Sequence, residues 1–218
     1  MRSLTYFSAA LAAVAVIVVA PAGASPRILA PVAPSQQALK SLHDQLQTWL
    51  VTHHFSGFRV SELMAFRQND YAAVTDKNGK PAFELLTWPA QKWVMEEPAS
   101  MMWNTRYGML GKLGTSSNGI LGPLGMMGGG MMGGLSAWYG DGAGKVSSVG
   151  QAAKVANSWL AHFRVGEKVE AGVRAYPGYF TLDTTYAGKT VGMLSVNAST
   201  GAVWYHGWHG VFLAERMF

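Results

Sequence analysis

Trp49-Leu50 and Trp159-Leu160 are the same dipeptide in two stretches of helical periodicity, and this recurrence decides the fold. Two further motifs keep the spacing: Asp70-Tyr71 recurs as Gly178-Tyr179, and Gly79-Lys80 followed by Leu85 recurs as Gly188-Lys189 followed by Leu194. The offsets of 110, 108 and 109 residues agree to within short insertions. A repeated unit of one helix followed by strands predicts two like modules, and it favours a binding module over a catalyst.

The first copy is expected to begin with a helix that Ser35 caps. Its apolar residues follow steps of three and four, which is the pattern of a helix with one buried face; they are Leu39, Leu42, Leu46, Trp49 and Leu50. Alternating apolar runs then continue to Met95, and Asn78-Gly79 between two of them indicates a hairpin turn.

The second copy repeats this order from Ser148, which with Gln151 has the spacing of a capping box. Strands are expected over residues 169–175, 179–185, 191–196 and 202–205, with turns at Ala187-Gly188 and Thr200-Gly201. The sequence therefore predicts an α+β fold of two repeated units, each a helix packed on a small antiparallel sheet, separated by a loop rich in glycine and methionine.

The N-terminal region predicts export. Arg2 precedes an apolar run from Ala9 to Ala20 and a small-residue stretch ending at Ala24, which is typical of a signal peptide cleaved before Ser25. An uncleaved N-terminal membrane anchor is the alternative. The expected domains are a signal peptide (1–24), a proline-rich joint (25–34), a first unit (35–98), a linker (99–146) and a second unit (147–218).

The amino-acid composition excludes some classes of cofactor and partner. The chain has no cysteine, which excludes disulfides, thiolate zinc sites and iron–sulfur clusters. Its formal net charge is +5, but the lysines and arginines are spread singly, so nucleic acid is not an expected partner. A weakly basic exported protein more readily meets an acidic envelope protein, a glycan or anionic lipid, the last as a peripheral membrane contact. The sequence leaves the oligomeric state open.

The second copy resembles the PepSY domain. The residues that carry the resemblance are Gly178-Tyr179-Phe180-Thr181, Gly188-Lys189 and Val196-Asn197-Ala198-Ser199-Thr200-Gly201-Ala202-Val203. The first copy is degenerate, because Thr87-Trp88-Pro89-Ala90-Gln91-Lys92-Trp93-Val94 keeps the length and the final valine but lacks the Thr-Gly turn. The resemblance implies an exported, non-catalytic binding or inhibitory module that engages another cell-envelope protein, and it implies no active site.

Methionines in the linker suggest a second function. Residues 99–146 hold fourteen glycines and seven methionines: Met101, Met102, Met109, Met126, Met127, Met131 and Met132. Thioether sulfur is a soft, unprotonated ligand that suits Cu(I) in a periplasmic or extracellular protein. The other interpretation is that these methionines form a pliable apolar surface that docks on a partner or a membrane.

The C-terminal sequence Trp204-Tyr205-His206-Gly207-Trp208-His209 is the other candidate site. His206 and His209 could share a metal ion only if Gly207 bends the chain, and their spacing lacks a nearby third ligand, because the glutamate available is Glu215. The alternative is an aromatic partner-binding edge formed by Tyr179, Trp204, Tyr205 and Trp208. Because the chain lacks nucleophile-elbow, zinc-protease and phosphate-loop motifs, we expect no enzyme.

Overall fold

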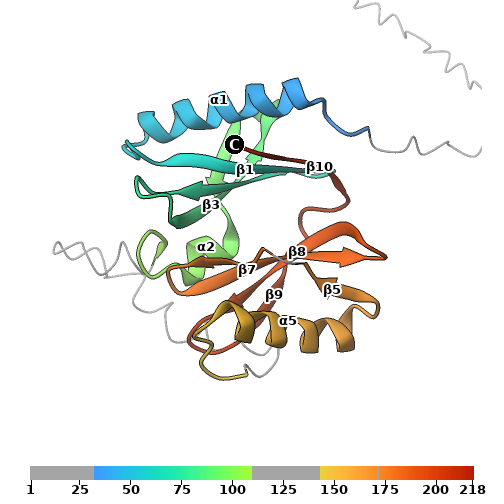
Figure 1. Ribbon diagram of the computed structural model, residues 1–218. Coiled ribbons are helices and arrows are strands. Elements are labelled where there is room, and N and C mark those ends of the chain that lie inside the picture. Colours follow the sequence, from blue (N-terminus) through green and yellow to red (C-terminus); the bar gives the residue numbers. More distant parts are fainter. Residues whose placement is uncertain (1–31, 110–142, 171) are drawn as a thin grey trace, which may run out of the picture. The chain divides into compact units, whose positions relative to one another are not determined.

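Two five-stranded antiparallel sheets, each with one long helix on its outer face, make up the structure (Figure 1). The computed structural model describes residues 32–109, 143–170 and 172–218. The helices are α1 (Gln36–Thr52), the 3-10 helix η1 (Pro89–Gln91), α2 (Pro98–Trp103) and α5 (Val149–Phe163). The strands are β1 (Arg59–Phe66), β2 (Asp70–Thr75), β3 (Pro81–Trp88), β4 (Trp93–Glu96), β5 (Glu167–Val169), β6 (Arg174–Tyr176), β7 (Tyr179–Tyr186), β8 (Lys189–Asn197), β9 (Val203–Tyr205) and β10 (Phe212–Met217).

Both long helices begin at the serines that the sequence indicated. The Ser35 hydroxyl accepts a hydrogen bond from the Ala38 N–H at 3.1 Å, and the Ser148 hydroxyl accepts one from the Gln151 N–H at 3.2 Å. Each helix is also tied to the strand that follows it by a polar side chain. Gln47 Oε1 accepts from the Val60 N–H, and Asn157 Oδ1 accepts from the Val169 N–H. These contacts fix the helix against its own sheet.

The first sheet has the order β10-β1-β2-β3-β4. Residues 147–218 were expected to form the second unit. The C-terminal strand β10 instead pairs with β1 of the first sheet, with Leu63 opposite Arg216. No turn motif connects the two strands, so the local sequence pattern does not predict that they pair. The chain thus closes the β1 edge of the first sheet with its own C-terminal strand.

The second sheet runs β5-β7-β8-β9, and β6 also pairs with β7. Its long hairpin β7–β8 turns at Ala187 and Gly188, both of which have positive φ. The β8–β9 connection turns at Gly201, whose φ is +70°. The expected turns at Ala187-Gly188, Thr200-Gly201 and Asn78-Gly79 are confirmed, since Gly79 also has a positive φ of 74°.

The two sheets pack face to face between the two helices, so the layers are helix, sheet, sheet, helix (Figure 1). Phe83 and Leu85 of β3 face α1, and Phe180 and Leu182 of β7 face α5. The middle layer is mixed: Met64, Tyr71, Leu86 and Met193 form its apolar part. The structure confirms an α+β fold with antiparallel sheets.

Arg174 joins the two sheets on one side of this middle layer. Its guanidinium contacts Glu62 of β1 and lies 3.1 Å from Asp183 Oδ2 of β7. The side chain of Glu62 is 1% exposed, and burial raises its pKa to about 8 while the Arg174 guanidinium opposes that rise.

The degenerate turn of the first copy keeps the backbone conformation that glycine provides in the second. Lys92 stands 109 residues before Gly201 and has φ +53°, in the left-handed region that costs a side-chain-bearing residue about 1 kcal/mol or more. At Gly201 an added Cβ would also lie 2.7 Å from the Gly144 carbonyl oxygen.

Glycine should therefore stabilise the protein at position 92, and Gly201 should not tolerate a side chain. We expect Lys92→Gly to raise the free energy of unfolding by up to about 1 kcal/mol, because relief of the left-handed strain exceeds the added entropy of the unfolded chain. Gly201→Ala should lower it by roughly 1–3 kcal/mol. Urea denaturation of both variants checks the pair, and a loss of stability in Lys92→Gly would contradict the assignment of strain.

Candidate functional site

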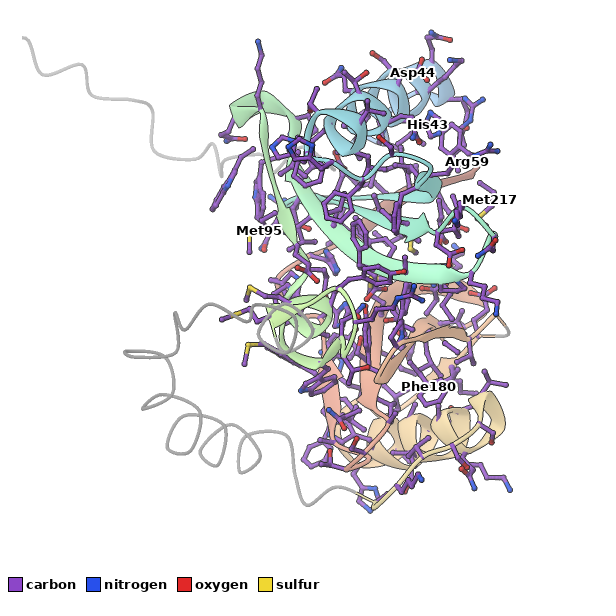
Figure 2. All side chains as sticks on the ribbon, turned by 90° about the vertical axis from the view of Figure 1, so that its left-hand side faces the viewer. His43, Asp44, Arg59, Met95, Phe180 and Met217 are labelled. Carbon is purple, nitrogen blue, oxygen red and sulfur yellow. The ribbon has the colours of Figure 1, made fainter. Side chains whose placement is uncertain are left out.

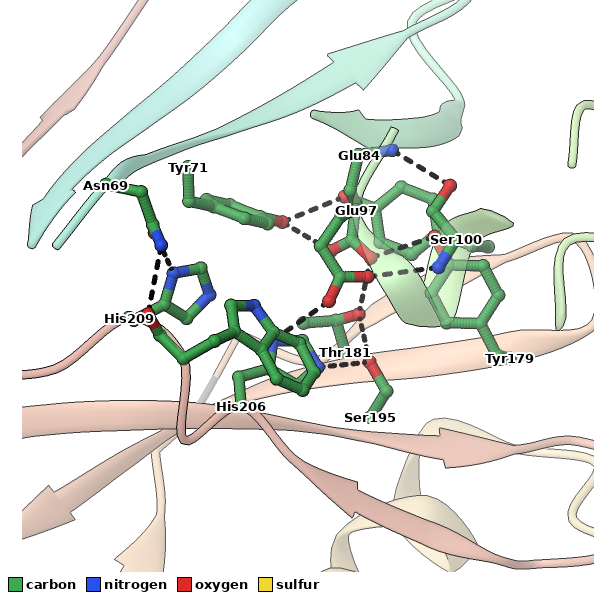
Figure 3. Close-up of polar contacts among 12 residues, drawn as sticks. Asn69, Tyr71, Glu84, Glu97, Ser100, Tyr179, Thr181, Ser195, His206 and His209 are labelled. Atoms are coloured by element: carbon green, nitrogen blue, oxygen red, sulfur yellow. Dashed lines mark hydrogen bonds and ion pairs between the residues drawn. The ribbon is translucent and has the colours of Figure 1, made fainter. Parts of the chain in front are cut away.

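A group of polar side chains lies in the middle layer, where a protein core is normally apolar (Figure 3). We call it the interface cluster; its members are Asn69, Tyr71, Glu84, Glu97, Tyr179, Thr181, Ser195, His206 and His209. All nine are buried. Strand alternation puts them there: on β3, Glu84 lies between two residues that face α1, and on β7, Tyr179 and Thr181 flank Phe180, which faces α5.

Glu84 is the centre of the cluster. Its carboxylate accepts hydrogen bonds from Tyr71 Oη of its own sheet, and from Tyr179 Oη at 2.8 Å and Thr181 Oγ1 at 3.0 Å of the other sheet. Burial raises the pKa of Glu84, and the three hydroxyl donors oppose that rise because they stabilise the ionised form. This one carboxylate therefore holds side chains of both sheets.

A chain of hydrogen bonds leads from Glu84 to His206. Thr181 Oγ1 lies 3.0 Å from Ser195 Oγ, which in turn lies 3.0 Å from His206 Nε2. Since Thr181 uses its proton on Glu84, it accepts from Ser195, and Ser195 must then accept from His206 Nε2–H. His206 is thus a neutral imidazole with its proton on Nε2 and a free lone pair on Nδ1.

Glu97 lies on the other side of His206. Its Oε2 caps α2 by accepting from the Ser100 N–H at 3.0 Å, and its Oε1 lies 3.6 Å from His206 Nδ1. Burial raises the pKa of Glu97 well above its usual range, and the negative charge of Glu84 adds to the rise. Burial also lowers the pKa of His206 well below its usual range. Both shifts favour the uncharged forms of the carboxyl and the imidazole.

His209 is oriented by Asn69. The Asn69 side-chain N–H donates to the Trp208 carbonyl at 3.0 Å, so Asn69 Oδ1 is left to accept from His209 Nδ1–H at 2.6 Å. The proton of His209 is thereby placed on Nδ1, and Nε2 carries the lone pair. Burial lowers the pKa of His209 to about 3, so this ring is also neutral.

The chain bends around Gly207, as sharing of a metal ion by His206 and His209 requires. Strand β9 ends at Tyr205, and a turn closed by the His209 N–H on the His206 carbonyl brings the two imidazole centroids to 5.5 Å. Both histidines are buried, and neither His206 Nδ1 nor His209 Nε2 has a hydrogen-bond partner. Within residues 32–109, 143–170 and 172–218, no three His, Asp or Glu side chains are arranged as a ready metal site.

The remaining candidate residues divide by exposure. Tyr179 is fully buried and bonded to Glu84, so it presents no surface to a partner in this structure. Trp204, Tyr205 and Trp208 are partly exposed. Met101, Met102 and Met109 lie in or just after α2 and are also accessible, whereas Met126, Met127, Met131 and Met132 lie outside the described residues.

A second feature lies at the other side of the first sheet. Here α1, β3, β4 and Tyr107 enclose a cavity of about 140 Å³. Its lining is mainly aromatic and aliphatic: Trp49, Phe55, Phe83, Leu85, Met95, Glu96 and Tyr107. The cavity opens beside β4, the last strand of its sheet. An apolar pocket at a sheet edge can take a side chain of an extended segment.

Sequence reasoning missed the acidic members of the interface cluster. Glu215 was the glutamate that the sequence offered as a third ligand, but Glu97 is the acidic residue that lies beside His206. The signal available was Glu84 itself, a single charge within the apolar run Ala82-Phe83-Glu84-Leu85-Leu86. A buried strand keeps such a charge only when another element supplies hydrogen bonds to it.

No protein-family model matches the sequence, and comparison with curated proteins and with solved structures gave no significant match. The resemblance of residues 178–203 to the PepSY domain stays a prediction.

The two glutamates should respond oppositely to the same substitution. Glu97→Gln replaces an uncharged carboxyl by an amide that can donate to His206 Nδ1, so the free energy of unfolding at pH 7 should change by less than about 1 kcal/mol. Glu84→Gln leaves hydroxyl donors without an acceptor and should cost roughly 2–4 kcal/mol. Chemical denaturation measures both. Equal losses in the two variants would mean that Glu97 is ionised in the folded protein.

Proposed function

We propose that the protein is an exported, non-catalytic binding module that takes an extended segment of another cell-envelope protein along β4. The observation that carries this proposal is the aromatic cavity of about 140 Å³ beside an open strand edge. Main-chain pairing would supply affinity, and the cavity would select the side chain that enters it.

The edge of β4 offers the hydrogen-bonding groups that such a segment needs. The Glu97 N–H donates to the Glu84 carbonyl at 2.9 Å, and Trp93 lies opposite Trp88. Bonded and non-bonded pairs alternate along an antiparallel ladder, so the N–H of Val94 points away from β3. In the described part of the chain, no backbone group outside the β3–β4 ladder accepts a hydrogen bond from it. Native edge strands are usually covered, bulged or charged, because open edges recruit other strands.

The size and lining of the cavity indicate an apolar side chain. An apolar cavity of about 150 Å³ can hold a molecule of the size of benzene, so this one suits a phenylalanine or leucine side chain. Outside it, Trp93 is 56% exposed and stacks on Trp88 with ring centroids 4.9 Å apart. An exposed tryptophan on β4, the strand that also lines the cavity through Met95 and Glu96, is typical of a surface that contacts a partner.

The export signal and the PepSY resemblance support the same proposal. The apolar run of residues 9–20 followed by Ala22-Gly23-Ala24 predicts transfer across a membrane into a periplasmic or extracellular space. Within the described residues, no helix has the length and apolarity needed to cross a membrane. The PepSY resemblance implies a module that binds or inhibits another envelope protein.

Soft-metal binding is a second candidate function. Met95, Met101 and Met102 are partly exposed, Met109 is 38% exposed, and Figure 2 shows several sulfur atoms gathered on the side of the molecule that carries Met95. Thioether sulfurs exposed on one side can collect Cu(I) or Ag(I). In this function the chain would buffer or carry the ion, with the methionines of residues 99–146 as its ligands.

Removing one N–H from the edge tests the binding module. Val94→Pro deletes the outward donor at a position where an edge strand tolerates proline, so the fold should persist while peptide affinity falls about 10-fold or more. Peptides selected from a phage-displayed random library against the wild-type protein serve as the probe. Val94→Thr keeps the N–H and the branched shape, and is the matched control. Selected peptides that bind Val94→Pro as tightly as Val94→Thr would rule out pairing along β4.

Replacing sulfur without removing apolar surface tests the soft-metal function. Leucine at Met101, Met102, Met109, Met126, Met127, Met131 and Met132 should leave folding and peptide binding nearly unchanged. If the methionines bind metal, competition with a colorimetric Cu(I) chelator should show a loss of most bound ions. Unchanged Cu(I) capacity in this seven-methionine variant would refute the methionine ligands.

A further inference from the structure

Two buried imidazole nitrogens of the interface cluster have lone pairs but no partner. They are Nδ1 of His206 and Nε2 of His209, on side chains that are 2% and 1% exposed. Buried polar atoms are nearly always paired, because an unpaired one costs its full desolvation energy. Two such atoms on neighbouring rings therefore call for a common explanation.

We propose that His206 Nδ1 and His209 Nε2 together bind one monovalent soft cation, Cu(I) or Ag(I). The proposal goes beyond binding of a peptide segment, and it does not depend on the methionines of residues 99–146. It names a different site, between the sheets rather than on the surface.

The arrangement of the two rings fits a two-coordinate ion. Metal–imidazole bonds are about 2 Å long, and ring centroids 5.5 Å apart are close enough for both rings to reach one ion. In Figure 3 the unpaired nitrogen of His209 is turned toward the side of His206 that carries Nδ1. Since no three His, Asp or Glu side chains of the described residues converge, the site suits an ion that needs only two strong ligands.

Each ring already has the second hydrogen bond that metal-binding histidines use. His206 Nε2–H donates to Ser195 Oγ at 3.0 Å, and His209 Nδ1–H donates to Asn69 Oδ1 at 2.6 Å. Such contacts fix the tautomer and aim the other nitrogen at the metal. Both rings are thereby preset with their lone pairs available.

The surroundings also suit a single positive charge. Glu97 Oε1 lies 3.6 Å from His206 Nδ1 and is itself without a hydrogen-bond partner. The ring of Trp208 stacks on His206 with centroids 4.7 Å apart, and an indole face attracts cations. The indole face, and the Glu97 carboxyl once binding of the ion releases its proton, would compensate the charge that the ion brings into the core.

An ion can reach the site through the turn that carries both histidines. Gly207 and Gly210 in this turn are exposed, and Trp208, which covers His206, is partly exposed. Opening of a short surface turn requires much less free energy than unfolding of the sheets. The same turn also leads into β10, so loading the site would stabilise the connection between the two sheets.

Nitrogen NMR of the seven-methionine variant tests the site after the methionines of residues 99–146 have been removed as competing ligands. Before metal is added, long-range ¹H–¹⁵N spectra of the full chain should show His206 protonated on Nε2 and His209 protonated on Nδ1. One equivalent of Ag(I) should shift His206 Nδ1 and His209 Nε2 and leave the other four histidines unchanged, and Zn²⁺ should not reproduce this shift. If Ag(I) leaves both resonances in place, the nitrogens face a buried water only and the proposal is overturned.

A matched pair of asparagine variants separates metal binding from folding. Asn69→Ala removes the acceptor that orients His209, and should weaken Ag(I) binding by about 10- to 100-fold. Asn104 is also buried and bonds the Ala82 carbonyl at 2.7 Å, far along the chain from the histidines. Asn104→Ala should destabilise the protein but leave Ag(I) affinity within about 3-fold of the parent. Equal Ag(I) affinity in the two variants would contradict the metal site. Neither result would decide the separate proposal that a peptide binds along β4.

Discussion

The carboxylate of Glu84 is the constraint on which the middle layer depends. A buried charge is tolerated only if hydrogen bonds replace its water, and here the donors come from both sheets: Tyr71 from one, Tyr179 and Thr181 from the other. An apolar interface would let two sheets slide by a residue or rotate at little cost. A carboxylate with three directed donors accepts one relative position, so this polar contact specifies how the layers meet while the apolar outer cores supply most of the stability.

Closure of the first sheet by β10 follows from the same geometry. The turn that carries His206 and His209 lies against the loop before β2, where the Gln68 N–H donates to the His209 carbonyl and Arg67 to that of Val211. These bonds deliver the chain to β1, and β10 then covers that edge. Among the described residues, β4 is therefore the end of the first sheet without a further strand, next to the aromatic cavity. The position of the proposed binding edge is a consequence of where the C-terminal strand goes.

Local patterns in the sequence were sufficient for the helices, the turns and the fold class. Helix steps of three and four, serine caps and glycine turns act within a few residues, so α1, α5 and the hairpins at Gly79 and Gly188 were predictable. The β1–β10 pairing joins residues about 150 positions apart, and nothing local encodes it. The same holds for the site: His206 and His209 were noticed as neighbours, but Glu97 approaches His206 from the N-cap of α2, and Glu84 of β3 is linked to His206 only through Thr181 and Ser195.

The donor and acceptor roles in the surrounding hydrogen bonds determine which nitrogen of each histidine is unpaired. Glu84 accepts from Thr181, which forces Ser195 to donate to Thr181 and His206 to donate to Ser195, so the only free position on that ring is a lone pair. Asn69 imposes the same result on His209 through its bond to the Trp208 carbonyl. Two independent sets of hydrogen bonds thus leave an acceptor, and not a donor, as the unpaired nitrogen of each imidazole, next to the unpaired indole N–H of Trp208. Two nitrogen lone pairs next to a carboxyl oxygen attract a cation, so the hydrogen bonds that Glu84 accepts between the sheets also determine what can bind there.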